Sequence, residues 1–504
     1  MKNKVINKNS LPEIRRKNED KKIVHCHGVF DLLHHGHFMH LKKASELGDI
    51  VVVTITSDRF VNKGPKRPYF TATERAFMLA SIESVDYVFI NDSPLATSVI
   101  SLLKPDIYLK GQDYKNIEDD KTGGIIKEKN AVEKDGGKIL FTDEPMNSSS
   151  IILNEYFLDW DESQKAIIND IKDKHSIDSI IKIVDEFNEL NVLVIGEPII
   201  DSYIFCDSQN IASKSPIISA RYKYQENYSG GSLAIANHLA ALGCKVTLLT
   251  CDSDDEEQHE LLVNKLNNNI KMKFHKIAEQ SIPKKIRFLN TGHHEKLFEL
   301  TYLSSDLWQK TNPKNFIKDI NRLSKSNDIV IIADFGHGLL EGEVLDTLKN
   351  IRQFCSLNVQ SNSGNLGYNL FTKHSRYDYL CLDLREYKLG LHDRLSSPEE
   401  LFSNNAGVKF NLPAATTLGP DGSMYIDHNG KTHYCPIFFK DIIDTIGAGD
   451  AYFSLTSLLT YKQTDPMLIP FLGNCHAGLK TRIIGNQKAV SKIDFIKTVK
   501  SILS

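Results

Sequence analysis

The 504-residue sequence lacks several features that would place it in a specialised class of protein. No apolar run approaches the roughly 20 residues that a membrane-spanning helix needs. The formal net charge is only −3, which gives no indication of a nucleic-acid or membrane-surface partner. The N-terminal 22 residues are charged and contain no apolar core, which argues against a secretory signal. We therefore expect a cytoplasmic protein that acts on small molecules, with no nucleic-acid or membrane partner.

The eight cysteines are scattered and show no C-x-x-C spacing. This distribution favours reduced, buried thiols over a disulfide framework or a zinc cluster. Hydrophobic residues make up 41% of the chain and charged residues 25%, as in an ordinary globular protein. The length exceeds what one hydrophobic core supports, so we expect two domains or three.

Short β-branched runs alternate with helical stretches along the chain, which is typical of parallel α/β sheets. The first set of expected strands lies at 22–31, 49–58, 85–92, 105–111 and 138–144. A second set begins at 191–201 and continues at 245–254, 328–338, 379–384 and 414–422. We predict a mobile tail (1–20), a first α/β domain (21–160), a helical linker (161–190) and a second α/β domain (191–504).

The stretch "HGVFDLLHHGHFMH" (27–40) contains five histidines. His34 and His37 are three residues apart, whereas the helical H-E-x-x-H zinc motif places its histidines four apart. Gly36 lies between them, and glycine is unfavourable inside a helix, so the pair is expected where a strand turns into a helix. A helix start binds anions, and histidines there can donate to phosphate oxygens. Nucleotide binding is therefore favoured over zinc, and background roles are expected for the remaining histidines.

The segment "GVFDLLHHGH" (28–37) resembles the G-x-F-D-x-x-H-x-G-H signature of the nucleotidyltransferase superfamily that makes CDP-glycerol, CDP-choline and ADP-heptose. Similar motifs follow at 56–79, 109–114 and 147–152. The resemblance implies a Rossmann-like domain in which His34 and His37 are catalytic. It also implies nucleotide or phosphate binding by Gly28, Phe30, Asp31, Lys63, Arg75, Lys110, Asp113, Ser148, Ser149 and Ser150. Lys63, Lys66 and Arg67 would add positive charge on a loop, or simply form a solvated surface.

The segment "DTIGAGDAYFS" (444–454) combines a glycine-rich turn with an aspartate and an apolar helical stretch. Consecutive backbone N–H groups in such a turn can hold an anion at a helix N-terminus. Asp450 could then accept the proton of a hydroxyl that attacks a γ-phosphate. A tight turn with a capping aspartate is the alternative.

Together with "GEPIID" (196–201) and "GGSLAIANHLAALG" (230–243), this segment resembles the ribokinase/PfkB family of sugar kinases. The resemblance implies a ribokinase-like α/β domain with a small β lid, in which Asp450 is the base and Gly447, Ala448 and Gly449 form the anion hole. Glu386, in "DLRE" (383–386), would bind Mg²⁺ and phosphate. Gly419 and Gly422 would lie on the nucleotide side. Sugar binding is implied for Asp201, Gly230, Gly231 and Asn237.

Both halves together resemble bifunctional heptose 7-phosphate kinase/heptose 1-phosphate adenylyltransferases, with the domain order reversed. Two departures concern the acceptor: Ala234 stands where that family has asparagine, and "QSNSGNLGYN" (360–369) replaces its D-P-K segment. The phosphate-transfer residues are kept, so we expect a rebuilt acceptor pocket and a substrate other than the standard heptose phosphate.

The resemblance predicts ATP-dependent phosphorylation of a sugar or sugar phosphate, and Mg²⁺-assisted nucleotidyl transfer to a sugar 1-phosphate with ATP favoured. A separate phosphatase would act between the two steps if the kinase acceptor is already phosphorylated. One alternative is a CTP-dependent cytidylyltransferase for a polyol or sugar phosphate, with a divergent kinase domain. Another is a silent, sugar-sensing or oligomerising C-terminal domain.

Alternating residues at 215–231 predict lid strands and a homodimer formed through the kinase domain.

Overall fold

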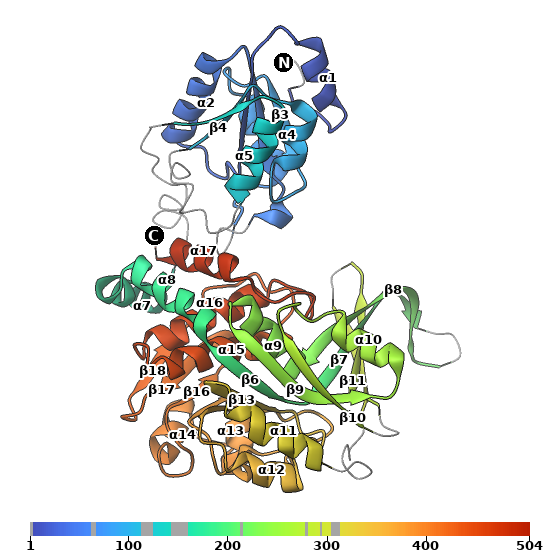
Figure 1. The fold of residues 1–504 in the computed structure, drawn as a ribbon, viewed down its shortest axis with the longest axis vertical. Coiled ribbons are helices and arrows are strands. Elements are labelled where there is room, and N and C mark those ends of the chain that lie inside the picture. Colours follow the sequence, from blue (N-terminus) through green and yellow to red (C-terminus); the bar gives the residue numbers. More distant parts are fainter. Residues whose placement is uncertain are drawn as a thin grey trace. The chain divides into compact units, whose positions relative to one another are not determined.

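The computed structural model describes residues 4–61, 67–111, 124–142, 160–211, 215–277, 281–292, 295–303 and 313–503. The chain divides into two compact units, residues 1–160 with 496–504 and residues 161–495 (Figure 1). Within the described ranges, no helix combines the length and the apolar character that a membrane span requires.

The first unit is built on a parallel five-stranded sheet with the order β3-β2-β1-β4-β5. Its strands are β1 (Ile23–Gly28), β2 (Ile50–Thr56), β3 (Tyr87–Asn91), β4 (Ile107–Lys110) and β5 (Lys138–Phe141). Every residue of the β2 run "IVVVTIT" is buried, as expected for a strand covered on both faces. The order of the strands reverses between β1 and β4, and in open α/β sheets ligands bind at the carboxyl ends of the strands beside such a reversal.

The described helices of this unit are α1 (Ser10–Lys17), α2 (His35–Leu47), α3 (Ala72–Ala80), α4 (Thr97–Leu103) and α5 (Gly124–Lys134), with the short 3₁₀ turn η1 (Asp58–Phe60). The fold class predicted for this part, a Rossmann-like parallel sheet, is confirmed.

The prediction of a mobile tail over residues 1–20 is wrong for much of that segment. Leu11 and Ile14 of α1 are buried in a cluster with Ile23 of β1 and neighbouring apolar residues. Val5 also forms a β-bridge with Val88. Two apolar side chains three residues apart lie on one face of a helix, and the burial of that face holds the segment on the sheet.

The second unit contains a nine-stranded sheet with the order β10-β9-β6-β13-β14-β15-β16-β17-β18. Its strands are β6 (Asn191–Gly196), β9 (Lys245–Ser253), β10 (Lys271–Ile277), β13 (Ile329–Asp334), β14 (Phe354–Val359), β15 (Tyr379–Asp383), β16 (Ala414–Thr417), β17 (Ser423–Ile426) and β18 (Thr432–Cys435). The strands from β10 to β16 are parallel, and β17 and β18 pair antiparallel at one edge. The carboxyl ends of seven strands therefore meet at one side of the sheet.

Helices cover both faces of this sheet, with α9, α15 and α16 over one face and α11 and α12 over the other (Figure 1). The helices of this unit are α7 (Glu162–Lys174), α8 (Ile177–Asp185), α9 (Ser232–Ala241), α10 (Glu256–Val263), α11 (Lys314–Ser324), α12 (Gly342–Leu348), α13 (Leu384–Leu391), α14 (Pro398–Asn405), α15 (Ala448–Tyr461) and α16 (Leu468–Lys480). The last helix, α17 (Lys492–Ile502), has residues in both units. Short 3₁₀ turns are η4 (Glu186–Glu189), η5 (Phe371–Lys373) and η6 (Gly419–Asp421).

Residues 161–190 are helical but do not form a free linker. Ile168 and Ile171 of α7 and Ile180 and Val184 of α8 are buried. The side chain of Gln164 donates a hydrogen bond from Nε2 to the backbone oxygen of Ile437 at 2.6 Å. The apolar face of each helix makes this segment part of the second unit.

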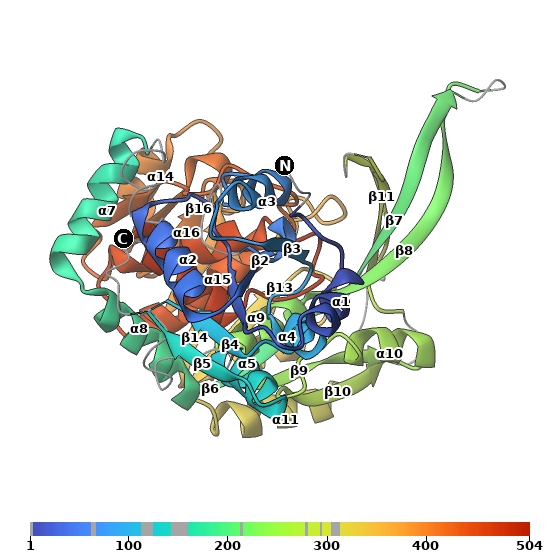
Figure 2. The same cartoon turned by 90° about the horizontal axis from the view of Figure 1, so that it is seen from above.

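A second, four-stranded sheet has the order β12-β11-β7-β8, with β7 (Pro198–Ile211), β8 (Ile218–Gly231), β11 (Lys284–Asn290) and β12 (Lys296–Tyr302). The hairpin of β7 and β8 extends well beyond the body of its unit (Figure 2). This sheet is the predicted β lid, and β8 confirms the strand expected near residues 215–231.

Candidate functional site

His34 and His37 lie together at the carboxyl ends of the first sheet. α2 begins at His35, directly after the loop that leaves β1 at Gly28. The ring centroids of His34 and His37 are 4.0 Å apart, and both side chains are half-buried. The backbone N–H groups of His35 and Gly36 have no acceptor among the described residues. Two imidazoles and the positive end of a helix thus meet where an anion can bind.

The loop between β1 and α2 packs beneath this histidine pair. Phe30 adopts a φ of 50°, a left-handed conformation that few non-glycine residues take. Its ring centroid lies 5.2 Å from that of His37, and the space beside Gly28 is filled by the same ring. Gly28 and Phe30 therefore shape the floor of the site.

Asp31, predicted to bind nucleotide, already has three internal partners, and its nucleotide role stays a prediction. Its buried carboxylate accepts hydrogen bonds from the backbone N–H groups of Tyr69 (2.7 Å) and Phe70 (3.0 Å). It also pairs with Arg67 at 3.0 Å, and both side chains of this pair are almost fully buried. Because these partners occupy the carboxylate, Asp31 positions the loop. Arg67, expected to supply charge on an exposed loop, instead joins this internal pair.

Arg75, predicted to bind phosphate, also bonds inside the protein, and its phosphate role stays a prediction. Its side chain is fully buried. The guanidinium donates to the backbone oxygens of Phe70 (3.0 Å), Val29 (2.5 Å) and Thr56 (2.9 Å), and to the carboxylate of Asp58 (2.6 Å). These acceptors belong to three segments that surround the site, so Arg75 fixes their backbones relative to one another.

Lys110 ends β4, beside β1, at the same side of the sheet as the histidine pair. Its Nζ lies 3.3 Å from Oε2 of the buried Glu128 on α5. Glu128 also accepts hydrogen bonds from the backbone N–H of Ala96 (2.8 Å) and the hydroxyl of Tyr108 (2.9 Å). A charge held this close to the strand end can attract a phosphate.

Of the other histidines of this region, His25, His27 and His40 lie inside the protein, whereas His35 is exposed. Burial, followed by the charge of Lys110, lowers the pKa of His27 to about 3 and that of His40 to about 4. Burial lowers the pKa of His25 as well. His25 and His27 both contact the hydroxyl of Thr54 at 2.8 Å. These three side chains are therefore neutral members of the core near neutral pH.

Several predicted ligands, namely Lys63, Asp113, Ser148, Ser149 and Ser150, lie outside the described residues, as does Lys66. In the part of the chain that the structure does describe, no group of three or more His, Cys, Asp or Glu side chains is arranged to hold a metal ion.

The second candidate site forms where α15 begins. Gly447 precedes the helix with a φ of 79°. A Cβ at this position would lie 2.4 Å from Oδ1 of Asn486 and 3.1 Å from Cε of Lys480, so only glycine fits. The N–H of Ala448 donates to Thr445 at 3.2 Å, whereas those of Gly449 and Asp450 have no acceptor within the described ranges. The anion hole would thus use the N–H groups of Gly449 and Asp450.

Asp450 is buried in the first turn of α15. Burial, together with repulsion from Asp201, raises the pKa of Asp450 to about 6. Nε2 of Gln360 donates to Oδ1 of Asp450 at 3.0 Å. A carboxylate with such a pKa can accept a proton from an attacking hydroxyl near neutral pH.

Asp201 of β7 lies at the same end of the unit. Nη1 of Arg287 donates to its Oδ1 at 2.5 Å, and Nδ2 of Asn486 approaches its Oδ2 at 3.4 Å. A Cβ on Gly230 would lie 2.4 Å from Oδ2 of Asp201, so glycine is required for this approach. Gly231 then caps α9. The structure thus brings Asp201, Gly230 and Gly231 toward Asp450.

The side chain of Asn237 bonds to a different segment from this group, and its sugar-binding role stays a prediction. Its amide nitrogen donates to the backbone oxygen of Lys265 at 3.0 Å, and its amide oxygen accepts the N–H of Asn267 at 2.9 Å. Both polar groups of the Asn237 side chain therefore bond to the turn that follows α10.

Glu386 lies in the first turn of α13, where it forms a reciprocal capping box with Asp383. Oε2 of Glu386 accepts the N–H of Asp383 at 2.9 Å, and its Oε1 accepts that of Ser361 at 3.0 Å. Burial, followed by the charge of Asp383, raises the pKa of Glu386 to about 8. Glu386 anchors the segment that carries Gln360 to Asp450, and its role toward Mg²⁺ stays a prediction.

Gly419 begins η6 and Gly422 directly follows it, in the turn between β16 and β17. Both have positive φ, at 61° and 99°. This turn follows the carboxyl end of β16, so it lies at the same side of the sheet as the ends of β14 and β15. The position of this turn is compatible with nucleotide binding by Gly419 and Gly422, which stays a prediction.

The unusual segment 360–369 folds back over the end of β13. The side-chain amides of Asn362 and Asn365 donate to the backbone oxygen of Phe335 at 3.1 and 3.0 Å. Nδ2 of Asn369 approaches both the carboxylate and the backbone oxygen of Asp334 at 3.2 Å. The replaced sequence therefore builds an ordered amide network near the predicted acceptor region.

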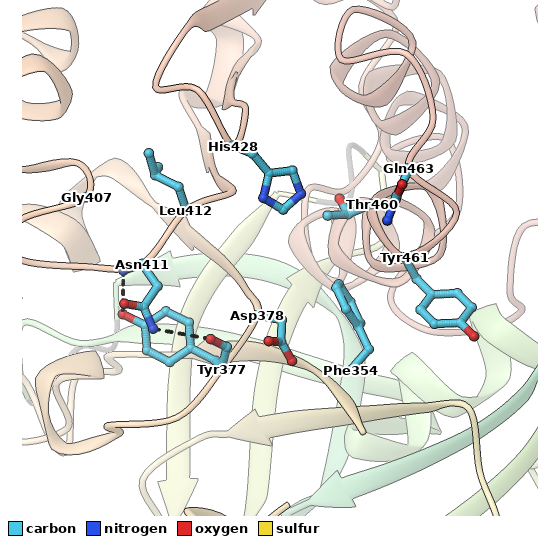
Figure 3. Close-up of a pocket in the computed structure, with 10 residues that line it drawn as sticks. All are labelled: Phe354, Tyr377, Asp378, Gly407, Asn411, Leu412, His428, Thr460, Tyr461 and Gln463. Atoms are coloured by element: carbon cyan, nitrogen blue, oxygen red, sulfur yellow. Dashed lines mark hydrogen bonds between the residues drawn. The ribbon is translucent and has the colours of Figure 1, made fainter. Parts of the chain in front are cut away.

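A separate pocket of about 580 Å³ lies in the second unit (Figure 3). Phe354 stands at the start of β14, and Tyr377 and Asp378 directly precede β15. These positions are at the amino ends of the strands, whereas Asp450 and Gln360 meet beyond the carboxyl ends. The pocket is therefore remote from the candidate kinase site.

Sequence reasoning missed Gln360, Arg287 and Lys480, which contact site residues directly or support the anion-hole turn. Gln360 begins the segment 360–369 that departs from the expected family sequence, whereas Arg287 and Lys480 lie within no recognised motif. For Lys480, the available signal was a lysine at the end of a largely apolar helical run, "LIPFLGNCHAGLK" (468–480).

The fold and the two sites are those of an α/β protein of the nucleotide-dependent transferase class. Residues 189–457 match the family described as pfkB family carbohydrate kinase. Residues 25–155 match the family described as cytidylyltransferase-like. The chain belongs to the pfkB family of carbohydrate kinases and carries a cytidylyltransferase-like domain ahead of its kinase domain, in the predicted order.

The N-terminal part is similar to curated proteins named bifunctional protein HldE. The protein from Helicobacter pylori strain P12 is 48% identical over 102 residues, which is 20% of this chain and 22% of that protein. The protein from Campylobacter jejuni strain RM1221 is 45% identical over 115 residues, which is 22% of this chain and 25% of that protein. The chain thus matches about a quarter of the length of these relatives.

Solved structures of phosphofructokinase-2 from Escherichia coli share the fold of the second unit. The complex with potassium and the tetrameric inhibited form are each 13% identical, with a TM-score of 0.50, and each match covers 62% of this chain and all of that chain. At this identity the likeness shows the fold alone.

Proposed function

We propose that the protein is a bifunctional, sugar-activating enzyme of the cytoplasm. Its kinase unit would phosphorylate a sugar or sugar phosphate with ATP, and its N-terminal unit would transfer a nucleotidyl group to a sugar 1-phosphate. The observation that carries the kinase half is the start of α15, where two N–H groups without an acceptor among the described residues adjoin a buried carboxylate with a raised pKa. Such an arrangement can stabilise a transferring phosphoryl group and accept a proton.

In the transferase half, an oxygen of the sugar 1-phosphate would attack the α-phosphate, and pyrophosphate would leave. His34, His37 and the start of α2 would donate to the charge that develops on phosphate oxygens. Lys110 would attract the triphosphate from the adjacent strand end. No protein nucleophile is needed, because the phosphate monoester is itself the nucleophile.

Mg²⁺ would neutralise phosphate charge in both reactions. Glu386 lies in no described cluster of ligands, and its oxygens accept two backbone hydrogen bonds. The nucleotide phosphates would therefore supply most of the ligands of the ion, as is usual for Mg²⁺.

CTP is the second candidate donor, because the N-terminal unit matches a family described as cytidylyltransferase-like. The product would then be a CDP-activated sugar or polyol, and the kinase unit could have a divergent substrate. ATP is favoured by the resemblance of both halves together to kinase/adenylyltransferases.

The kinase acceptor would differ from the standard heptose phosphate. The amides of Asn362, Asn365 and Asn369 form an ordered network beside the predicted acceptor region. If the acceptor already carries a phosphate, a separate phosphatase must act before nucleotidyl transfer. A silent, sugar-sensing kinase unit is less well supported, because Asp450 and its anion-hole turn are intact.

The four-stranded lid supports a homodimer formed through the kinase unit. Strand register places Ile286, Phe288, Phe298, Leu300 and Tyr302 on one face of that sheet. Phe298, Leu300 and Tyr302 have exposed fractions of 58%, 43% and 56%. An apolar sheet face this exposed is a candidate subunit interface. A solution mass equal to one chain would reject the dimer.

The deciding experiment measures pyrophosphate release with ATP and CTP in parallel, against a panel of sugar 1-phosphates and polyol phosphates. Release that depends on ATP and a sugar 1-phosphate supports the proposal. Release with CTP alone assigns the second candidate. ATP consumption against a panel of sugars and sugar phosphates tests the kinase separately, and retained sugar binding without turnover would support the silent unit.

A further inference from the structure

Lys480, the last residue of α16, is fully buried, which is rare for a lysine. Its Nζ donates hydrogen bonds to the backbone oxygens of Ile446 and Gly485, each at 2.7 Å. Desolvating an ammonium group is costly, so it is tolerated only where carbonyl or carboxylate oxygens surround it.

The two carbonyls belong to the turns that hold the candidate anion hole. Ile446 directly precedes Gly447, and the methylene chain of Lys480 packs where a Cβ of residue 447 would lie. Asp444 ties the same turns together, because it accepts the N–H of Ile446 at 3.1 Å and that of Gly485 at 2.8 Å. Lys480 therefore sits directly behind the N–H groups that would face a phosphate.

We propose that Lys480 is a positioning residue of the kinase unit: a built-in cation that fixes the anion-hole turn and offsets the carboxylates around it. This inference rests on the proposed kinase function. Without the ammonium group of Lys480, the two backbone carbonyls and the nearby carboxylate could bind a monovalent cation such as K⁺ or NH₄⁺. In this chain the ammonium group is covalently attached, so the kinase reaction requires no added monovalent cation.

The charges facing Lys480 agree with this role. Asp444, Asp450 and Asp201 raise the pKa of its ammonium group, whereas Lys296 lowers it. Burial is the largest influence, and the pKa of Lys480 falls to about 8. The charge is then present at neutral pH and is lost above pH 8. Kinase activity should therefore show an alkaline limb near that pH.

The test uses the full-length variants Lys480→Ala and Lys480→Met, with Lys462→Ala as a matched control. Lys462 follows α15 and pairs with Glu186 in a half-exposed salt bridge. We expect both Lys480 variants to lose about 100-fold in kcat with little change in KM, because the anion-hole N–H groups that Lys480 positions act mainly in the transition state. NH₄⁺ or K⁺ should restore part of the activity of Lys480→Ala only, and the alkaline limb should disappear from both variants.

A readout independent of catalysis separates this inference from the proposed function. NH₄⁺ or K⁺ should raise the thermal unfolding temperature of Lys480→Ala, whereas tetramethylammonium, which is too large for the vacated site, should not. If no sugar is phosphorylated by the wild type, the proposed function fails while the cation test still stands. The inference is overturned if Lys480→Ala keeps wild-type kcat, or if neither its activity nor its unfolding temperature responds to small cations. Lys480→Met separates loss of charge from loss of packing.

Discussion

Gln360 donates a hydrogen bond from Nε2 to Oδ1 of Asp450 across 3.0 Å. The next residue, Ser361, donates its backbone N–H to Glu386 at the same distance. The segment that departs from the expected family sequence thus contacts the proposed catalytic carboxylate directly. It therefore lies at the candidate kinase site as well as at the predicted acceptor region.

Asp450→Asn should reduce ATP-dependent sugar phosphorylation by about 10²- to 10⁴-fold, because the asparagine amide cannot accept the proton. Pyrophosphate release by the N-terminal unit should stay unchanged. Asp441→Asn, an exposed change nearby in sequence, is the control and should leave both activities intact. Equal losses in Asp441→Asn would point to a folding defect.

The kinase rate should fall about tenfold per pH unit below pH 6. The pKa of Asp450 is raised to about 6, and only the ionised carboxylate can act as a base. Gln360 stabilises the ionised form, so Gln360→Leu should raise this pKa further and move the acid limb to higher pH. A pH–rate profile of both proteins at saturating substrate checks the shift. An acid limb that does not move would contradict the role of Gln360.

His37→Ala should abolish most pyrophosphate release, and the kinase activity should persist. The loss follows from removing a donor at the site where charge develops, which typically costs about 10²- to 10³-fold. His35→Ala provides a matched control, because His35 lies in the same first turn of α2 but is exposed. If the two variants lose activity equally, the ring of His37 has no special role.

Arg75→Met should destabilise the first unit by at least about 3 kcal/mol, because three backbone oxygens would lose a buried partner. The control is Arg59→Met, which removes an arginine of the same region. Arg59 pairs with Asp92, and both side chains of this pair are more than half exposed. That change should cost less than about 1 kcal/mol. Urea unfolding of the full chain compares them, and similar midpoints would refute the positioning role.

The first unit should lose stability as the pH falls from about 6.5 to 4. The pKa of His40 is lowered from 6.5 to about 4 in the folded state, mainly by burial. As the pH falls, His40 therefore binds a proton in the unfolded chain before it does so in the folded protein. This difference favours unfolding until His40 is also protonated in the folded state. The shift corresponds to roughly 3 kcal/mol. Urea midpoints measured across this range should drop, and the drop should be smaller in His40→Gln.

The sequence by itself determined the two α/β units, their order and the two glycine- or histidine-containing helix starts. It could do so because these features are local: strand and helix periods are read within a few residues, and a helix start follows from its own turn. The positions of His34, His37, Gly447 and Asp450 at helix starts were therefore predictable.

Only the tertiary structure decided which polar residues face the sites. Three residues that match or adjoin recognised motifs form their hydrogen bonds with other groups inside the protein: Asp31, Arg75 and Asn237. Gln360 and Lys480 carry no motif, yet each contacts the site or its support. Gln360 and Asp450 are 90 residues apart in the chain, and Lys480 and Ile446 are 34 residues apart. A contact of that separation depends on how whole elements pack, which no local pattern records.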